Sequence, residues 1–450
     1  MFEVFLIVTV LIVGVGVFCA IDGSRDVFHP LVFIGPMMIF IYAWMPFKLS
    51  STDSLSRYFQ PDQLITVEKI NVLGILAFIA ACLYAGVRFR GQKILRAPVL
   101  TAEGCRRLMT AGALAGSVGI VCWGISIINV GGFVRAYSTA YSGAWDDSGY
   151  IRDAAMLLLV GVLLSLTSLA SGGERTRGMI QVAVISFPWL SQALLLGRRG
   201  PTFAYVIVVL MGWYTTRRKR PPFVAMGGLG FALGWLVLFL VTNRSNIYIG
   251  SSFDVKTDVS SVVETADTGN EYIYGSGTML AAMRRNHYFW MRRYLAEILV
   301  RPIPSAVWPT KYQDFGVPEL LNNAGTGEGF ADALGWVGAV GSAPGIVADL
   351  YVEVSWLCIP LMAVLGWAYG FVWRKAVIKG GPWSSQYVIL SALSIYLVMQ
   401  TMEAVIFRTI ELSLPLWLAW RWALAPPKLT PIQAREKRLA MQSQAGYEHA

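Results

Sequence analysis

The stretch GRRGP, at Gly197–Pro201, separates two apolar runs of the chain, Met179–Leu196 and Thr202–Thr216. Each run is long enough, or nearly so, to cross a lipid bilayer. Two adjacent guanidinium groups cannot face lipid, so we expect Arg198 and Arg199 to lie at an interface or in an aqueous cavity. The side of the membrane on which they lie therefore decides what these arginines can do.

The composition assigns the chain to a class before any motif is considered. Of its 450 residues, 55% are hydrophobic and only 14% are charged, whereas soluble proteins carry about 25% charged residues. We therefore predict an all-α polytopic membrane protein. The net charge of +10 is typical of basic cytoplasmic loops. No soluble segment is long and basic enough to form a nucleic-acid-binding domain.

Cysteines and histidines are few and scattered. The five cysteines form no CxxC pair, and four of them lie in or beside apolar runs, so we expect neither a disulfide framework nor a zinc site. Three histidines are too few for a histidine-rich metal centre, although a carboxylate metal site stays open. No nucleotide-binding or Ser-His-Asp signature is present. We predict no metal and no cofactor.

Apolar runs of membrane-spanning length recur along the chain and predict about eleven spans. They are Phe2–Ala20, Pro30–Phe47, Glu68–Val87, Leu108–Ile128, Asp153–Ala170, Met179–Leu196, Thr202–Thr216, Phe223–Val241, Val352–Trp373, Gln386–Met402 and Ile410–Leu424. The first lacks a basic leader and a cleavage site, so we expect it to remain uncleaved. The small-residue spacing of Gly112, Gly116 and Gly119 predicts close helix packing.

These spans divide the chain into four parts. They are an eight-helix region at 1–241, a large loop at 242–351, a three-helix region at 352–424 and a tail at 425–450. Within the loop, Asn243–Asn270 is polar and loop-like, and Glu271–Val300 has helical character. Arg301–Asn323 carries four prolines and should be irregular. Gly325–Gly345 is rich in Gly and Ala and can re-enter the membrane edge.

Lys and Arg between the spans predict the orientation, because they gather in cytoplasmic loops. With eleven spans, the richest basic clusters fall on one side: Arg88–Arg107, Arg217–Arg220, Arg374–Lys379 and the tail after Pro427. We take that side as the cytoplasm. The N-terminus and the large loop then lie outside, and the C-terminus lies inside. GRRGP falls on the outer face, where positive charge is normally scarce.

Several other arginines share this outer face. They are Arg135, Arg152, Arg244, Arg284, Arg285, Arg292, Arg293, Arg301 and Arg408. Arginine binds phosphate with a planar fork and keeps its charge when partly desolvated, so the set predicts an anionic, phosphorylated ligand. The alternative is structural: such arginines also reach lipid headgroups or pair with acids of the loop.

Three residues are candidates for a general base. His287 lies one turn from Arg284, and a histidine beside arginines tends to stay neutral. Asp349 and Glu353 lie one helical turn apart and should project to one side of a helix. Each carboxylate could instead be an arginine partner or a helix N-terminal acid. We interpret Glu403 and Arg408 separately, as an ion pair that holds the last two helices together.

Four segments carry a family resemblance. They are GRRGPTFAYVIV (Gly197–Val208), RPIPSAVWPTKY (Arg301–Tyr312), GIVADLYVEVSW (Gly345–Trp356) and MEAVIFR (Met402–Arg408). Together with the span count and the large outer loop, they resemble Wzy-type oligosaccharide repeat-unit polymerases. These enzymes make O-antigen, enterobacterial common antigen and capsule or exopolysaccharide. The O-antigen ligases share the same architecture.

The resemblance implies a glycosyltransferase with GT-C-like architecture in the bacterial inner membrane. Its activity would be inverting and metal-independent, with a polyprenyl-diphosphate-linked oligosaccharide as donor and as acceptor. A flippase and a chain-length regulator would be partners. Arg199, with Arg198 beside it, matches the arginine of the family's Gly-x-Arg turn, and Arg408 matches the arginine before the last span.

The match around Asp349 is less regular. Asp349 matches a position that is often acidic, and Tyr351 follows it as in the family. At Ser355 the family usually has a glycine after an Asn-Phe pair, and Glu353 falls where that Asn would be. The resemblance therefore leaves the role of Glu353 open. The set of binding candidates is Arg198, Arg199, Arg244, Arg284, Arg285, Arg292, Arg408 and Tyr351, and the catalytic candidates are His287, Asp349 and Glu353.

The sequence is compatible with three rival functions. A lipid-linked oligosaccharide flippase or other transporter predicts charges buried mid-span and repeat symmetry between halves. We find almost no mid-span charge, and the outer loop has no counterpart in the first half. A structural or signalling protein would leave the outer arginines without a purpose. An O-antigen ligase would differ only in the acceptor.

Overall fold

The computed structural model of the chain describes residues 1–87, 100–138, 149–196, 199–216, 220–243, 246–251, 270–323, 327–339 and 342–426. Throughout these residues the regular structure is helical. The first half contains α1 (Phe2–Ser24), α2 (Pro30–Ile39), the π-helix η1 (Phe40–Trp44), α3 (Met45–Ser51), the 3₁₀ turn η2 (Leu55–Arg57), α4 (Pro61–Val87), α5 (Ala102–Asn129), α6 (Phe133–Ala136), α7 (Gly149–Ala154), α8 (Leu157–Ala170), α9 (Arg175–Leu196), α10 (Arg199–Thr216) and α11 (Phe223–Asn243).

The predicted outer loop and the C-terminal region are also helical where they are described. The loop contains α13 (Glu271–Arg285), α14 (Arg292–Leu295), the π-helix η4 (Ala296–Val300), α15 (Lys311–Asp314), α16 (Val317–Asn323) and α17 (Gly327–Leu334). They are followed by α18 (Gly345–Val354), the 3₁₀ turn η5 (Ser355–Leu357), α19 (Cys358–Lys379), α20 (Pro382–Met399) and α21 (Met402–Leu424).

The helices confirm a membrane-embedded, polytopic protein. Six segments are long and apolar enough to cross a membrane: Phe2–Ser24, Pro30–Ser51, Pro61–Gly86, Ala102–Asn129, Arg175–Leu196 and Gly345–Lys379. Shorter apolar helices cover Leu157–Ala170, Gly200–Thr215 and Phe223–Leu236. Every predicted span overlaps a helix, but membrane crossing by the shorter helices, α20 and α21 stays a prediction.

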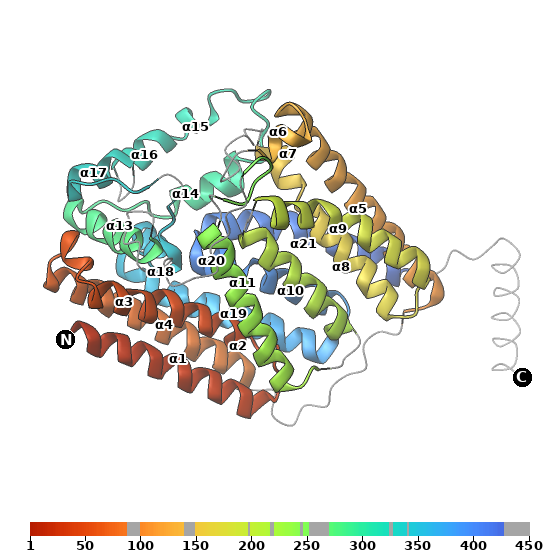
Figure 1. Ribbon diagram of the computed structural model, residues 1–450, viewed down its shortest axis with the longest axis horizontal. Coiled ribbons are helices and arrows are strands. Elements are labelled where there is room, and N and C mark those ends of the chain that lie inside the picture. The colour runs from red at the N-terminus through yellow and green to blue at the C-terminus, as the bar shows by residue number, and fades with distance from the viewer. Residues whose placement is uncertain are drawn as a thin grey trace, which may run out of the picture.

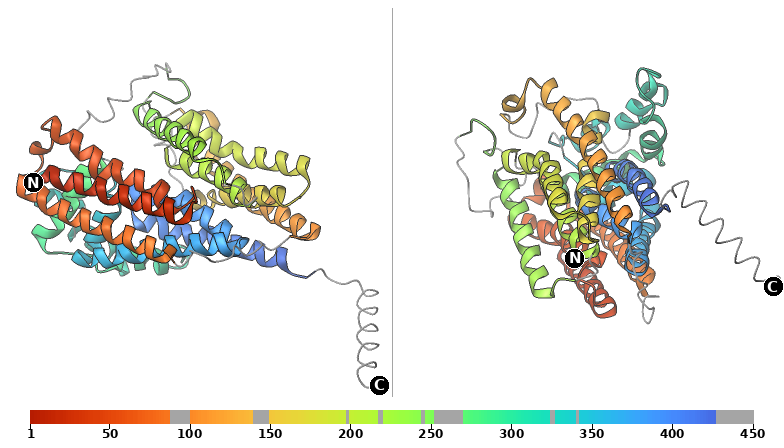
Figure 2. Two further views of the ribbon diagram at one scale, coloured as in Figure 1. Left: turned by 90° about the horizontal axis from the view of Figure 1, so that it is seen from below. Right: turned by 90° about the vertical axis from the view of Figure 1, so that its right-hand side faces the viewer.

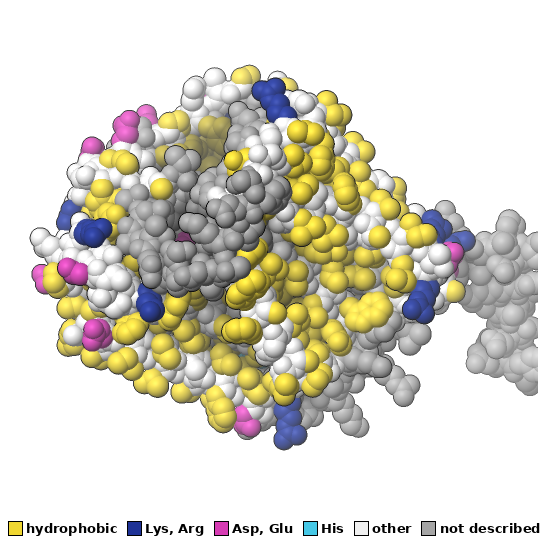
Figure 3. All heavy atoms as spheres, in the orientation of Figure 1, with side chains coloured by type: hydrophobic (Ala, Val, Ile, Leu, Met, Phe, Trp, Pro, Cys, Tyr) yellow, Lys and Arg dark blue, Asp and Glu magenta, His cyan; other side chains and the backbone are white. Residues whose placement is uncertain are grey.

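The long helices run side by side along the length of the molecule (Figure 2). The loop helices α13, α16 and α17 gather at the end where the N-terminus lies (Figure 1), as expected if both are on the same side of the membrane. Hydrophobic side chains cover a broad face of the bundle, and charged side chains lie towards its edges (Figure 3). Such a surface is typical of a bundle surrounded by lipid tails.

Glycines let the bundle helices approach closely, as predicted for α5. A side chain at Gly112 would meet the Gly161 carbonyl of α8 at 3.0 Å, and one at Gly116 would collide with Ile185 of α9. On α19, Gly366 and Gly370 lie directly against backbone carbonyls of α4. The hydrophobic effect is weak between helices in lipid. Small residues at such crossings therefore hold the helices together by close packing.

The helical segment at the predicted boundary between loop and ninth span, 351/352, starts before that boundary. The helix α18 already begins at Gly345, and the predicted span is interrupted at Ser355, which has φ 53° and ψ −137°. The helix can bury Asp349 and Glu353 completely because an arginine outside it neutralises them.

The loop predictions are confirmed in part. Glu271–Val300 is mostly helical as predicted, but Arg301–Asn323, predicted to be irregular, contains α15 and α16. Pro318 is compatible with α16 because it lies in the helix's first turn, where proline's missing N–H has no partner to lose. Most of Asn243–Asn270 lies outside the described residues.

Candidate functional site

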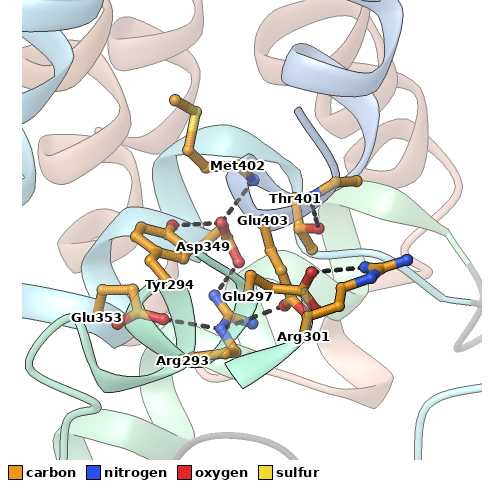
Figure 4. Close-up of polar contacts among 10 residues, drawn as sticks. Arg293, Tyr294, Glu297, Arg301, Asp349, Glu353, Thr401, Met402 and Glu403 are labelled. Carbon is orange, nitrogen blue, oxygen red and sulfur yellow. Dashed lines mark hydrogen bonds and ion pairs between the residues drawn. The ribbon is translucent and has the colours of Figure 1, made fainter. Parts of the chain in front are cut away.

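The two carboxylates of α18 converge on one arginine of the loop (Figure 4). Arg293 of α14 donates to Asp349 and, at 2.8 Å from Nε, to Glu353. Both carboxylates are 0% exposed, and the arginine side chain is 11% exposed. The prediction that they project to one side of the helix is confirmed, and of the roles considered for them the structure displays that of arginine partner.

Asp349 makes further hydrogen bonds beyond this ion pair. The Tyr294 hydroxyl donates to its Oδ2 at 2.6 Å, and the backbone N–H of Met402 donates to the same oxygen at 2.8 Å. Burial, followed by the charge of Asp349, raises the pKa of Tyr294 well above its usual value, so this phenol stays a donor. Asp349 thus joins the loop to the start of α21, and most of its capacity as an acceptor is used.

The backbone just before Arg293 adopts a strained conformation. The chain passes under the end of α18, where the N–H groups of Phe289 and Trp290 donate to the carbonyls of Val352 and Glu353 at 3.0 and 2.6 Å. It then adopts φ 52° at Trp290 and φ 65° at Met291. Two consecutive non-glycine residues in the left-handed region cost roughly 1–3 kcal/mol each. The N–H groups of Phe289 and Trp290 bond carbonyls at the C-terminal end of α18, which have no partner within the helix.

A second set of charges extends the network from the start of α21 to η4 and α7. Glu403, in the first turn of α21 and before the predicted span, lies 3.6 Å from Arg293 and is hydrogen-bonded to Glu297 of η4. Glu297 accepts from Arg301 at 2.5 Å, and Arg301 also pairs with Asp153 of α7. Burial, and then the hydrogen bond with Glu297, raises the pKa of Glu403 to about 8.

A different arrangement surrounds Arg408, farther along α21. Its guanidinium carbon lies 4.5 Å from the ring centroid of Tyr396 on α20. Gly200 also lies close to that ring: a side chain there would meet the Tyr396 ring and hydroxyl at 2.9 Å. Gly200 follows Arg199, the first residue of α10. Gly200 and Arg408, almost 210 residues apart in sequence, therefore both lie next to one tyrosine.

Polar atoms around Arg408 are left without partners. Nη1 of Arg408, Oγ1 of Thr409 and Oε2 of Glu411 are buried and find no hydrogen-bond partner among the described residues. Buried polar groups in proteins are nearly always hydrogen-bonded. These three atoms lie within about one turn of α21 and mark a place where a polar ligand or water would bind.

The remaining predicted residues lie apart from these two centres or outside the described residues. Arg198 and Arg244 are not among the described residues, and for Arg199 only the backbone is described. His287 is exposed and follows the end of α13. Tyr351 is buried, with its ring against Tyr288 and Trp356. These roles stay predictions.

The surface arginines of the loop have local structural partners. Arg284 donates to the carbonyl of Ala333 at 2.6 Å, Arg285 pairs with Asp332 at 3.2 Å, and Arg292 donates to the carbonyl of Phe315 at 3.2 Å. All three side chains are exposed. Their binding roles are untested, but each guanidinium already stabilises the loop fold.

The interpretation of Glu403 and Arg408 as a pair joining two helices is wrong. Both belong to the single helix α21, which begins at the Thr401 N-cap rather than at the predicted Ile410. Glu403 instead faces Arg293. The side chain of Thr401 accepts from the N–H of Ala404, which allows the helix to start among charged residues.

Sequence reasoning named Arg293 and Arg301 only as two of the outer arginines, with pairing to loop acids as the alternative to phosphate binding, and it missed their partners Tyr294, Glu297 and Asp153. A signal was present, because Arg293, Glu297 and Arg301 are spaced by four residues with alternating charge, which places them on one helix face. Glu411 was missed because its apolar neighbours made the segment resemble an uncharged span.

Comparisons with known proteins assign no identity to this arrangement. No family model matches the chain, and neither a curated protein nor a solved structure matches it. In the part of the chain that the structure describes, no three His, Cys, Asp or Glu side chains are grouped so as to hold a metal ion.

Proposed function

We propose that this protein is a glycosyltransferase that polymerises polyprenyl-diphosphate-linked oligosaccharide repeat units by inverting transfer. The observation that carries the proposal is the meeting of Arg408 and the α10 N-terminus around Tyr396, with a guanidinium nitrogen buried and unsatisfied. An arginine with a free donor beside a helix N-terminus suits a phosphate group. The membrane-embedded helices suit a lipid-linked substrate.

The chemistry of such a transfer needs a positive environment for the leaving group. When the anomeric C–O bond breaks, negative charge develops on the departing polyprenyl diphosphate, and a fixed guanidinium stabilises it without reorganisation. Arg408 is suited to this task because no carboxylate forms an ion pair with it among the described residues. Arg293, in contrast, is surrounded by three carboxylates and is unsuited to binding a further anion tightly.

The proposal includes a location and a topology. The protein would lie in a bacterial inner membrane with its N-terminus outside, its tail in the cytoplasm and the site at the outer face. The arrangement of basic clusters supports this orientation, as does the position of the loop helices at the N-terminal end of the bundle (Figure 1). A flippase would then supply the donor, and a chain-length regulator would act on the product.

The test is direct binding of undecaprenyl diphosphate to the purified protein in detergent. Arg408→Met should weaken binding by about 10–100-fold, the range expected for losing a hydrogen bond from a charged group. The matched control is Arg57→Met, which removes an exposed arginine of the η2 turn that is not a binding candidate and should leave affinity unchanged. Undecaprenyl monophosphate tests whether the second phosphate contributes.

Two results would contradict the proposal. One is equal affinity of the wild type and Arg408→Met for undecaprenyl diphosphate. The other is a deletion strain that makes surface polysaccharide of normal length. Loss of only a lipid-A-linked cap on deletion would change the acceptor and make the protein a ligase.

A further inference from the structure

Glu411 is a partly buried carboxylate within an apolar helix, and the function proposed above gives it no role. It lies in the predicted span Ile410–Leu424, and its Oε2 is buried without a hydrogen-bond partner among the described residues. An ionisable side chain inside a membrane helix is costly and is normally retained for function, facing a partner or an aqueous cavity. The partner must therefore come from the groups around it.

The charged groups around Glu411 come from three elements. They are Asp153 of α7, Arg301 at the end of η4 and Arg408 on α21 itself. Asp153 pairs with Arg301, which also binds Glu297 and lies 4.2 Å above the Phe407 ring. Because two carboxylates already neutralise Arg301, it offers Glu411 little compensation.

Arg408 is the remaining cation among these neighbours. It lies three residues before Glu411, so both side chains project from the same face of α21. Each has one buried atom without a partner. A donor and an acceptor thus lie one turn apart on one face, and both are free to bind a ligand placed between them.

We propose that Glu411 is the general base of the transfer reaction, an inference that rests on the proposed function. The Glu411 carboxylate takes the proton of the acceptor hydroxyl as that oxygen bonds to the anomeric carbon of the donor. The bond from this carbon to the diphosphate oxygen breaks, and its electron pair leaves with the polyprenyl diphosphate. Arg408 stabilises the departing charge, and the proton remains on Glu411.

The other carboxylates of the network are less suited to this role. Asp349 accepts hydrogen bonds from Arg293, Tyr294 and Met402, and Glu353 is bound to Arg293. Glu403 is engaged with Glu297. Glu353 also has a buried oxygen without a partner, Oε2, but its other oxygen is held by Arg293. Taking a proton would weaken the interactions by which these three carboxylates hold the loop on the bundle, whereas no ion pair holds Glu411 among the described residues.

The experiment uses Glu411→Gln, which keeps the side-chain shape and removes the base. Lipid-linked repeat units extracted from membranes of a deletion strain serve as donor and acceptor, and released polyprenyl diphosphate is measured by mass spectrometry. We expect kcat to fall by about 10²–10⁴-fold, the usual contribution of general base catalysis, with undecaprenyl diphosphate affinity within about twofold of wild type, the resolution we expect of that assay. Glu411→Asp should retain part of the activity.

The matched control is Glu68→Gln. Glu68 is a fully buried glutamate of a different helix, α4, and is bonded to Tyr272 and Asn71, so this variant should keep the wild-type kcat. A wild-type kcat in Glu411→Gln would overturn the proposal, and so would a loss of diphosphate binding in step with activity. Failure of the proposed function can be distinguished from failure of the role proposed for Glu411, because in the first case the wild-type protein would show no Arg408-dependent diphosphate binding.

Discussion

Arg293 and Arg408 both lie beside or on helix α21, the first through Glu403 and the second as part of the helix, but their charges differ in how far they are neutralised. Arg293 faces three carboxylates, and Asp349 among them also accepts hydrogen bonds from a phenol and a backbone N–H. Arg408 has an aromatic ring on one side and a buried nitrogen without a partner. One arginine is saturated by the protein itself, and the other is not.

This difference separates a structural role from a binding role. A buried ion network in which every charge is paired fixes one arrangement of its elements, here the loop helix α14, α18 and the start of α21. An unpaired buried donor costs free energy in the empty protein and is worth that cost only if a ligand binds it. Ligand binding therefore depends on which outer arginines remain unpaired. The total number of outer arginines says less about it.

The largest expected effect comes from removing Arg293, whose charge the protein's own carboxylates neutralise. Arg293→Met should destabilise the protein by about 3–5 kcal/mol, because Asp349 and Glu353 would remain buried without their counter-charge. Arg408→Met should change stability by less than about 1 kcal/mol, since no ion pair is lost. Thermal unfolding of both variants in detergent measures the difference.

A reversed order of these two stabilities would remove the distinction between the two centres. The triple variant Arg293→Met, Asp349→Asn, Glu353→Gln serves as the control. Removing the charges together should recover much of the loss, because the penalty comes from uncompensated carboxylates rather than from the missing arginine.

A smaller effect is expected from pH, through Glu403 at the edge of the saturated network. Its pKa is raised to about 8 in the folded protein, against 4.5 for an ordinary glutamate. The folded state therefore holds this proton more tightly than the unfolded state does. The contribution to stability is complete below about pH 4.5, falls as pH rises, and is lost above about pH 8.

Glu403→Gln should remove this dependence. The stability of the wild type relative to the variant should decline between about pH 4.5 and 8, by at least about 1.4 kcal/mol, the equivalent of one pKa unit. Thermal midpoints across that pH range measure the decline, and the exposed Glu174→Gln variant is the control. Parallel profiles for the wild type and Glu403→Gln would show that the carboxyl pair does not share a proton.

The sequence predicts the helical, membrane-embedded fold because long apolar runs leave few alternatives. It also predicts that Asp349 and Glu353 share a helix face, since helix periodicity alone requires it. The topology of the loop is harder. Its charged residues are read as exposed, although several are buried against each other, and no property of a single residue distinguishes the two cases.

The neighbours Arg292 and Arg293 illustrate this limit. Arg292 is exposed and bonds a loop carbonyl, whereas Arg293 is the centre of the network. Adjacent residues of a helix point in directions about 100° apart, and the left-handed conformations of Trp290 and Met291 precede the helix α14 that carries both. Neither residue is a glycine or an asparagine, so the sequence carries no turn signal there. Long-range contacts, such as that of Gly200 with Tyr396, are likewise invisible before the chain is folded.

The smallest expected effect concerns Ser355, where α18 ends beside the saturated network. Its φ of 53° and ψ of −137° suit glycine, the residue that the Wzy-type resemblance expects at this position. Ser355→Gly should stabilise the protein by about 1 kcal/mol, because relief of roughly 1–3 kcal/mol of strain exceeds the added entropy of the unfolded chain. Ser355→Ala keeps the strain and should give no gain. Thermal unfolding distinguishes the two.

Combining Ser355→Gly with Arg293→Met shows whether the saturated network is what holds the backbone in this conformation. If Arg293 fixes the end of α18 through Glu353, then without it the turn at Ser355 can relax, and glycine gains little. The two changes would then be non-additive by about the gain of the single variant, a coupling that a double-mutant cycle resolves when it exceeds about 0.5 kcal/mol. Additive effects would mean that the strain at Ser355 is set by the packing of α18 and α19 alone, and that the network stabilises the loop without straining the helix break.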